Sequence, residues 1–135
     1  MSLPARGERL DEIQIGPFDA AAIAAYARVS GDDNPLHTDL PLARAAGFAA
    51  PPVHGMRLMA AIEPALAAWR ADLRIAQIAA TFAEPLLAGE TARLSGRVLQ
   101  SGADEILMRV TIQGPRRGPC VVAEARLAPR EGAPA

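Results

Sequence analysis

Beyond residue 73 the chain alternates between apolar and polar residues, which is the pattern of a β-strand with one buried face. In the segment 105–113, for example, Ile106, Met108, Val110 and Ile112 occupy every second position. Glycine and proline mark the turns between such segments. The alternation predicts strands over residues 74–82, 91–99, 105–113 and 120–127, and a shorter alternating run predicts a first strand over 10–15.

Helical patterns occupy most of the chain before that point. Asp19 is a good N-cap, because its carboxylate can accept hydrogen bonds from the free N–H groups of the first turn. Gly31 suits the end of this helix, which runs to about Ser30, because glycine readily takes a positive φ. A second, short helix is predicted between an N-cap at Asp39 and Gly47.

The most apolar helix is predicted to begin at about His54. Its apolar side chains recur at helical spacing: Met56, Met59, Ile62, Leu66 and Trp69. Pro64 is expected to kink or end it, because proline lacks the N–H that bonds one turn back and its ring clashes with that turn.

Helices followed by a run of strands indicate an α+β fold, in which an antiparallel sheet carries helices on one face. The length of 135 residues fits a single domain, 1–135, with an ordered core over about 8–129. An open sheet edge invites pairing, so we expect a homo-oligomer, most simply a homodimer.

Composition narrows the function classes. A net charge of −1 gives no electrostatic footprint for nucleic acid. The single cysteine, Cys120, excludes an intramolecular disulfide and a thiolate zinc cluster. The longest apolar run, Ala20–Ala27, is too short to span a membrane, and the first residues lack the apolar core of a signal peptide. A soluble cytoplasmic protein without membrane contacts is expected.

Candidate chemistry concentrates in the loop between the first two helices. Gly31 and Pro35 favour a tight loop, and Asp32 and His37 lie five residues apart across it. A carboxylate can accept a proton, and imidazole titrates near neutral pH, so the pair suits acid–base catalysis. Asn34 could hold the loop or a substrate through its amide.

Other interpretations of this loop exist. Asp32, Asp33 and Asn34 could form a solvated turn, since these residues favour turns. The loop lacks the alternating acidic ligands and the glycine of an EF-hand. A metal site from Asp32, His37 and His54 lacks a helical pair of histidines four residues apart.

Gly55 lies at the predicted start of the apolar helix, between His54 and Met56. Free N–H groups at a helix start, with the positive end of the helix dipole, suit an oxyanion. The absence of a side chain at Gly55 would allow a substrate carbonyl to approach closely. Together with the acid–base pair, this pattern indicates proton chemistry next to a carbonyl.

Two segments carry a resemblance to a known family. The segment 26–39, YARVSGDDNPLHTD, followed by Phe48, Pro51-Pro52-Val53 and His54-Gly55-Met56, resembles the hydratase motif of the MaoC-like (R)-specific enoyl-CoA hydratases. The segment 82–90, FAEPLLAGE, is similar to a strand-turn signature of the same family. The resemblance covers almost the whole chain, and the first motif is highly specific.

The resemblance implies a hot-dog fold, in which a curved antiparallel sheet wraps around a long central helix. It implies hydration of a trans-2-enoyl-CoA to the (R)-3-hydroxyacyl-CoA, or the reverse dehydration. Asp32 and His37 would hold the catalytic water, with Asn34 nearby, and the Gly55 N–H would bind the thioester oxygen. No metal or other cofactor is expected, since the CoA thioester is itself the substrate.

The acyl-CoA substrate is expected to contact further residues near these groups: Pro35, His54, Met56, Met59 and Glu63. Glu63 suggests a polar or branched acyl group, unless Pro64 turns it toward solvent. Arg57 stands where an apolar residue is expected. Three alternatives share the fold: a dehydratase acting on acyl carrier protein, a hot-dog thioesterase, and a non-catalytic subunit of a heterodimer. The thioesterases typically lack the Asp-to-His spacing seen here, and the intact Asp32, His37 and Gly55 argue against the non-catalytic subunit.

Overall fold

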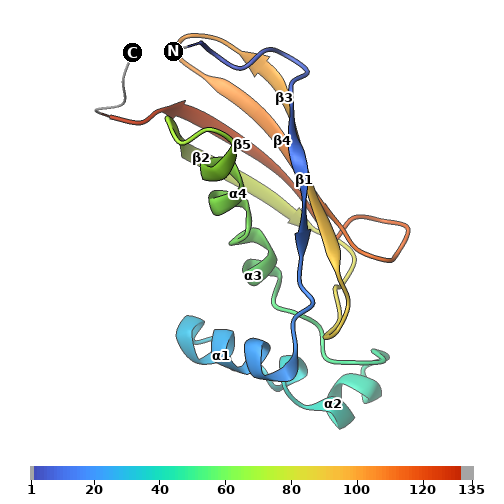
Figure 1. Ribbon diagram of the computed structural model, residues 1–135. Helices are drawn as coiled ribbons and strands as arrows, with labels where there is room; N and C mark the ends of the chain where they lie inside the picture. The colour runs from blue at the N-terminus through green and yellow to red at the C-terminus, as the bar shows by residue number, and fades with distance from the viewer. Residues whose placement is uncertain (1, 132–135) are drawn as a thin grey trace.

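The structure, a computed structural model that describes residues 2–131, is built on one antiparallel sheet of five strands (Figure 1). The strands lie in the order β1-β3-β4-β5-β2, so β1 and β2 form the two edges. Their bounds are β1 Arg9–Ile15, β2 Leu73–Phe82, β3 Ala92–Ser101, β4 Ile106–Gln113 and β5 Val121–Pro129. All five predicted strands are confirmed, with bounds shifted by at most two residues.

Alternation along the strands separates a buried face from an exposed one. In β4 the side chains of Ile106, Met108, Val110 and Ile112 are no more than 1% exposed, as the sequence pattern predicts. Burying such a side chain contributes about 1.5–3 kcal/mol each to stability. Their register against β3 and β5 makes this buried face continuous across the middle of the sheet.

The helices lie against one side of the sheet and at one end of it. α3 (Gly55–Met59) and α4 (Ile62–Trp69) cover the buried face, whereas α1 (Ala20–Ser30) and α2 (Leu40–Ala45) gather beyond its end (Figure 1). A short 3₁₀ helix, η1 (Pro35–His37), connects α1 to α2. This arrangement is the predicted α+β fold with a curved sheet around a central helix.

Local capping explains the helix bounds. Asp19 accepts the N–H of Ala22 at 2.8 Å and begins α1. Gly31 ends α1 with a φ of 78°, a conformation that favours glycine. Asp39 accepts the N–H of Leu42 at 3.1 Å and begins α2. The three capping predictions are confirmed.

The central helix is interrupted rather than continuous. α3 ends at Met59 and α4 begins at Ile62, so the break lies at Ala60 and Ala61. Pro64 falls in the first turn of α4, where its missing N–H costs little. Since proline clashes with the carbonyl four residues earlier, the break lies one turn before it, at Ala60.

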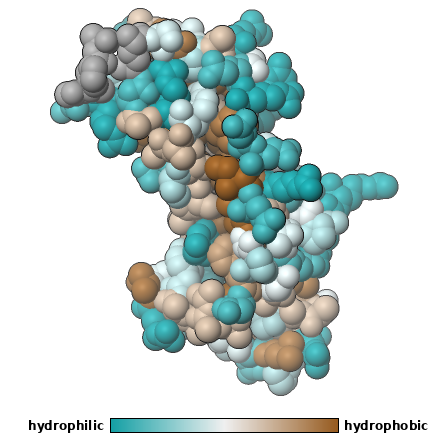
Figure 2. All heavy atoms as spheres, in the orientation of Figure 1, coloured by the Kyte–Doolittle hydropathy of each residue, from teal (hydrophilic) through white to brown (hydrophobic). Residues whose placement is uncertain are grey.

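An apolar groove of about 420 Å³ runs between β1 and the two central helices. It is lined by Ile13, Ile15, Ala60, Ala61, Pro64 and Ala65, with Arg57 at its side. Figure 2 shows hydrophobic atoms gathered in this part of the molecule, between more hydrophilic ends. Among residues 2–131, no helix combines the length and the hydropathy that a membrane span requires.

Candidate active site

Three side-chain hydrogen bonds shape the loop that joins α1 to η1. The Ser30 hydroxyl accepts the N–H of Asp32 at 3.2 Å, and the Asp32 carboxylate accepts the N–H of Asn34 at 3.4 Å. The Asn34 amide oxygen accepts the N–H of Leu36 at 3.1 Å and caps η1. Local bonds of this kind are why Ser, Asp and Asn favour turns. They set the backbone path on which Asp32 approaches His37.

The His37 ring is held by one edge and open at the other. Its Nδ1 lies 2.8 Å from the carbonyl oxygen of Pro52. A carbonyl can only accept, so Nδ1 carries the proton, and the lone pair of the neutral ring is on Nε2. Nε2 faces the Asp32 carboxylate at 3.9 Å, which is too long for a hydrogen bond but suits a bridging water. Two acceptors therefore point at one site for a water molecule.

His54 contacts both Asp32 and His37. Its side chain is 2% exposed, and its ring stacks on the His37 ring with centroids 3.8 Å apart and planes 23° apart. Its Nε2 lies 3.0 Å from the backbone carbonyl oxygen of Asp32, to which it donates. The Tyr26 ring lies edge-on to the His54 ring, with centroids 4.9 Å apart and planes 74° apart.

Asp32, His37 and His54 also form a cluster whose potential ligand atoms lie within 4.8 Å of one another. One nitrogen of each ring is occupied by a bond to a backbone carbonyl. The other nitrogens, His37 Nε2 and His54 Nδ1, are left without a hydrogen-bond partner among residues 2–131, and His37 Nε2 faces the Asp32 carboxylate. This placement of a base beside a carboxylate suits acid–base chemistry.

Gly55 is the first residue of α3, immediately after His54. Within residues 2–131 its N–H bonds to no acceptor, as expected at a helix start. The Phe82 ring packs against its Cα, and a Cβ at this position would lie 2.9 Å from the ring. A side chain at this position would therefore force the Phe82 ring to move.

A hollow of about 250 Å³ opens beside Gly55. Its walls come from three parts of the chain: the connector before α3 with α3 itself, the end of β2 with the segment after it, and Cys120 just before β5. Apolar groups such as Leu58, Phe82 and Pro85 dominate, and Glu84 adds one carboxylate. Burial raises the pKa of the Cys120 thiol, so this residue contributes a neutral surface to the wall.

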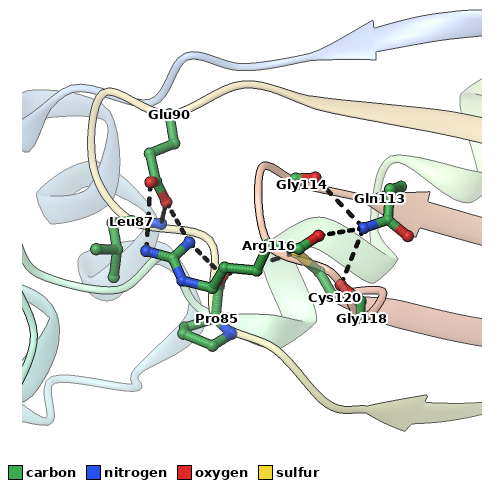
Figure 3. A network of polar contacts seen from close by, with 8 residues as sticks. All are labelled: Pro85, Leu87, Glu90, Gln113, Gly114, Arg116, Gly118 and Cys120. Carbon is green, nitrogen blue, oxygen red and sulfur yellow. Dashed lines mark hydrogen bonds and ion pairs between the residues drawn. The ribbon is translucent and has the colours of Figure 1, made fainter.

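A polar network holds the segment that carries Pro85, one of the residues lining this hollow (Figure 3). Arg116 binds Glu90 through two hydrogen bonds, at 2.7 and 3.3 Å, and also donates to the Pro85 carbonyl at 3.2 Å. The N–H of Leu87 donates to the same Glu90 carboxylate at 2.8 Å. Gln113 holds the Arg116 carbonyl at 2.7 Å. The network joins the loop between β4 and β5 to the segment after β2.

Opposing effects set the pKa of Glu90. Burial is the largest single influence and raises it, whereas the bonds from Arg116 and from the Leu87 N–H lower it. These two bonds and the positive charge of Arg116 together outweigh burial, so the pKa of Glu90 lies below its ordinary value. The carboxylate is thus ionised near neutral pH and keeps its ion pair with Arg116, which we call the Glu90–Arg116 clamp.

The predicted site residues divide into two groups. Asp32, Asn34, His37, His54 and Gly55 come together around the loop and the start of α3. The other predicted substrate contacts, Pro35, Met56, Met59 and Glu63, do not line the hollow beside Gly55.

Each of these four residues has its own environment. Pro35 is exposed in η1, and Met56 is 57% exposed on α3. Met59 packs partly against the core, and Glu63 is exposed in the first turn of α4. Their contact with substrate stays a prediction.

Arg57, unexpected after the His-Gly-Met element, has a local partner. Its guanidinium lies over the Phe18 ring, 4.9 Å from the centroid. A cation over an aromatic face is an attractive contact, so the charged residue is accommodated beside the apolar groove.

The sequence pattern did not single out Phe82, Glu84 or Cys120 as part of the hollow. They join Gly55 only because β2 pairs with β5, which places Phe82 opposite Val121. In the sequence, Phe82 and Glu84 are marked only by the family resemblance of the segment 82–90, and no periodicity points to them.

Comparisons with known proteins identify the family of this chain. The model of the MaoC-like domain matches residues 4–113. The (R)-specific enoyl-CoA hydratase of Aeromonas caviae is 51% identical over 41 residues, which is 30% of this chain and 31% of that protein. The peroxisomal multifunctional enzyme type 2 of Drosophila melanogaster is 39% identical over 74 residues, 53% of this chain. The matched part is only 12% of that enzyme.

Solved structures share the fold at lower identity. The (R)-hydratase from A. caviae involved in PHA biosynthesis has a TM-score of 0.84 and 24% identity, with 94% of this chain and 98% of that one covered. A chain of the ChsH1-ChsH2 complex from Mycobacterium tuberculosis has a TM-score of 0.83 and 23% identity, covering 93% and 98%. These likenesses identify the predicted hot-dog architecture.

Proposed function

This chain belongs to the MaoC-like domain family of hydratases and dehydratases, and on that basis we propose that it hydrates a trans-2-enoyl-CoA to the (R)-3-hydroxyacyl-CoA or catalyses the reverse dehydration. The observation that supports this most is the placement of His37 and Asp32. The lone pair on His37 Nε2 and the Asp32 carboxylate face each other at 3.9 Å, a separation at which one water placed to the side can hydrogen-bond to both. A hydratase needs such a water, held by two acceptors beside its substrate.

The proposed reaction uses this water as the nucleophile. Asp32 accepts a hydrogen bond from one O–H of this water, whose hydrogen stays on the oxygen, and His37 Nε2 removes the other proton as the oxygen attacks the β-carbon. His37 then returns this proton to the α-carbon, so one water is added and the ring ends in its starting state. Dehydration follows the same steps in reverse.

The negative charge that develops on the thioester oxygen needs a donor. The Gly55 N–H is free of acceptors within residues 2–131 and lies at the start of α3. A hydrogen bond formed only as charge develops lowers the barrier of the reaction. The mostly apolar hollow beside Gly55 is suited to the acyl chain, and Pro35, His54, Met56, Met59 and Glu63 remain proposed contacts.

A homodimer is the proposed assembly. The edge strand β2 ends at Phe82, whose side chain is 46% exposed, and Met56 is exposed on α3. Burying exposed apolar groups and an open sheet edge favours association.

Incubation with crotonyl-CoA tests the proposed reaction. We expect the enoyl thioester absorbance to fall and the product to be (R)-3-hydroxybutyryl-CoA, as shown by chiral analysis. Release of free thiol would instead identify a thioesterase. The rate with crotonyl-CoA should also be compared with the rate with the crotonyl thioester of acyl carrier protein. A strong preference for the carrier-protein thioester would overturn the assignment of CoA as the carrier.

A further inference from the structure

His54 is a buried histidine to which the proposed reaction assigns no proton transfer, yet it contacts the Asp32 backbone and the His37 ring and directly precedes Gly55. We infer that His54 is a positioning residue, which holds Asp32 through a backbone hydrogen bond and His37 through ring stacking. The inference rests on the proposed function, because it concerns the geometry of the same water site.

The first contact fixes Asp32. The Asp32 side chain is 53% exposed, and the side-chain bonds that shape its loop join residues only two apart. The bond from His54 Nε2 to the Asp32 carbonyl, at 3.0 Å, links residues 22 apart. It therefore ties an otherwise exposed loop to the start of α3.

The second contact fixes His37. One hydrogen bond, from Nδ1 to the Pro52 carbonyl, holds one edge of the ring but allows it to tilt about that bond. The His54 ring lies against the face of His37 at 3.8 Å and opposes such a tilt. Tyr26 supports the stack by its edge-on contact with His54 at 4.9 Å.

The third link runs through the backbone. The Gly55 N–H belongs to the peptide unit whose carbonyl is that of His54. This carbonyl accepts the N–H groups of Arg57 and Leu58 at 3.0 and 3.3 Å, so it points into α3. In a trans peptide the N–H points the opposite way, and the anchored His54 therefore also orients the proposed oxyanion donor.

His54 is placed to position these groups and not to exchange protons with substrate. Its Nε2–H is directed at a backbone carbonyl, and its Nδ1 is buried with no partner among residues 2–131. A proton on Nδ1 would leave a buried donor unsatisfied, which is unfavourable. The two histidines are thus opposite tautomers, Nδ1–H in His37 and Nε2–H in His54.

Three substitutions separate the two contacts of His54. His54→Phe keeps a ring for the stack and removes the donor, His54→Gln keeps an N–H donor and removes the ring, and His54→Ala removes both. Because small misplacements at a reacting centre are costly, we expect kcat for crotonyl-CoA hydration to fall on the order of 100-fold in His54→Ala, with KM little changed. The Phe and Gln variants should each recover part of the loss.

Ile62→Val serves as the matched control, since Ile62 is fully buried in α4 and lies outside the loop and the hollow. It should lower the melting temperature and leave kcat unchanged. If His54→Ala behaves like Ile62→Val, with lower stability and a normal kcat, the positioning role is overturned.

Imidazole NMR tests the same geometry without substrate. The chain has two histidines, so removing His54 leaves the signals of His37 alone. We expect one Nδ1–H and one Nε2–H tautomer in the wild type, with the former assigned to His37. If hydration fails but this pattern is found, the proposed function is wrong and the anchoring stands. If both rings are the same tautomer, the anchoring is wrong whatever the activity.

Discussion

At the scale of single residues, the carbonyl oxygen of Pro52 determines which nitrogen of His37 can act as a base. It binds Nδ1 at 2.8 Å and so leaves the lone pair on Nε2, toward Asp32. Pro52 belongs to an extended connector, and the decisive atom is in its backbone. No side-chain pattern reveals such an atom, which is why the sequence predicted the Asp32–His37 pair but not what orients it.

The proposed oxyanion donor, the Gly55 N–H, can be tested by a substitution that removes this N–H. Gly55→Pro deletes the N–H at the first position of a helix, where proline is well tolerated. Gly55→Ala is the matched control, because it keeps the N–H and introduces a similar close contact with Phe82, 2.9 Å from the added Cβ. We expect kcat of Gly55→Pro to be ~10²–10³-fold below that of Gly55→Ala. Equal kcat values in the two variants would show that the Gly55 N–H does not bind the thioester oxygen.

At the scale of elements, local chemistry predicted most bounds and long-range contacts explain the rest. The caps at Asp19, Gly31 and Asp39 act within one turn, so the sequence alone reveals them. The clamp between Glu90 and Arg116 joins residues 26 apart and has no periodic signature. It forms only when the loop between β4 and β5 folds back on the segment after β2.

This clamp predicts a dependence of stability on pH. Since the pKa of Glu90 is lower in the folded protein, its contribution is full above the ordinary glutamate pKa and is lost as the pH falls through the folded-state value. Glu90→Gln should therefore lower the free energy of unfolding by about 1–2 kcal/mol at neutral pH. The difference in free energy of unfolding between the wild type and Glu90→Gln should disappear as the pH falls below the folded-state pKa of Glu90.

Urea unfolding across this pH range measures the effect. Glu124→Gln is the control, because Glu124 pairs with Arg109 on the exposed face at 3.3 Å, and such pairs contribute little. A gap for Glu90→Gln that persists unchanged into acid would contradict the proposed charge clamp.

At the scale of the whole molecule, the order of strands and the hollow are the parts that the sequence could not give. Alternation identified all five strands, but their order, β1-β3-β4-β5-β2, depends on which edges meet in three dimensions. Only that order brings Phe82 and Cys120 beside Gly55. The family resemblance implies the architecture, because its motifs are short segments that can be recognised in the sequence without knowing which strands pair.

The proposed homodimer is a property at this scale. Sedimentation equilibrium should give a mass twice the 14.1 kDa of the chain, because association of two copies would bury the open β2 edge and the exposed Phe82. A mass of one chain at concentrations used for activity would contradict the dimer, and a higher multiple would require a further interface.

The central claim is that Asp32 and His37 hold the reacting water, and one pair of variants tests it most directly. Asp32→Asn and Asp33→Asn make the same change in adjacent, exposed residues of one loop. Only Asp32 faces His37 Nε2, at 3.9 Å. The measurement is kcat for crotonyl-CoA hydration by the two variants and the wild type. The account predicts that Asp32→Asn nearly abolishes turnover while Asp33→Asn stays close to the wild type. Near-normal turnover in Asp32→Asn, or an equal loss in both, would contradict it.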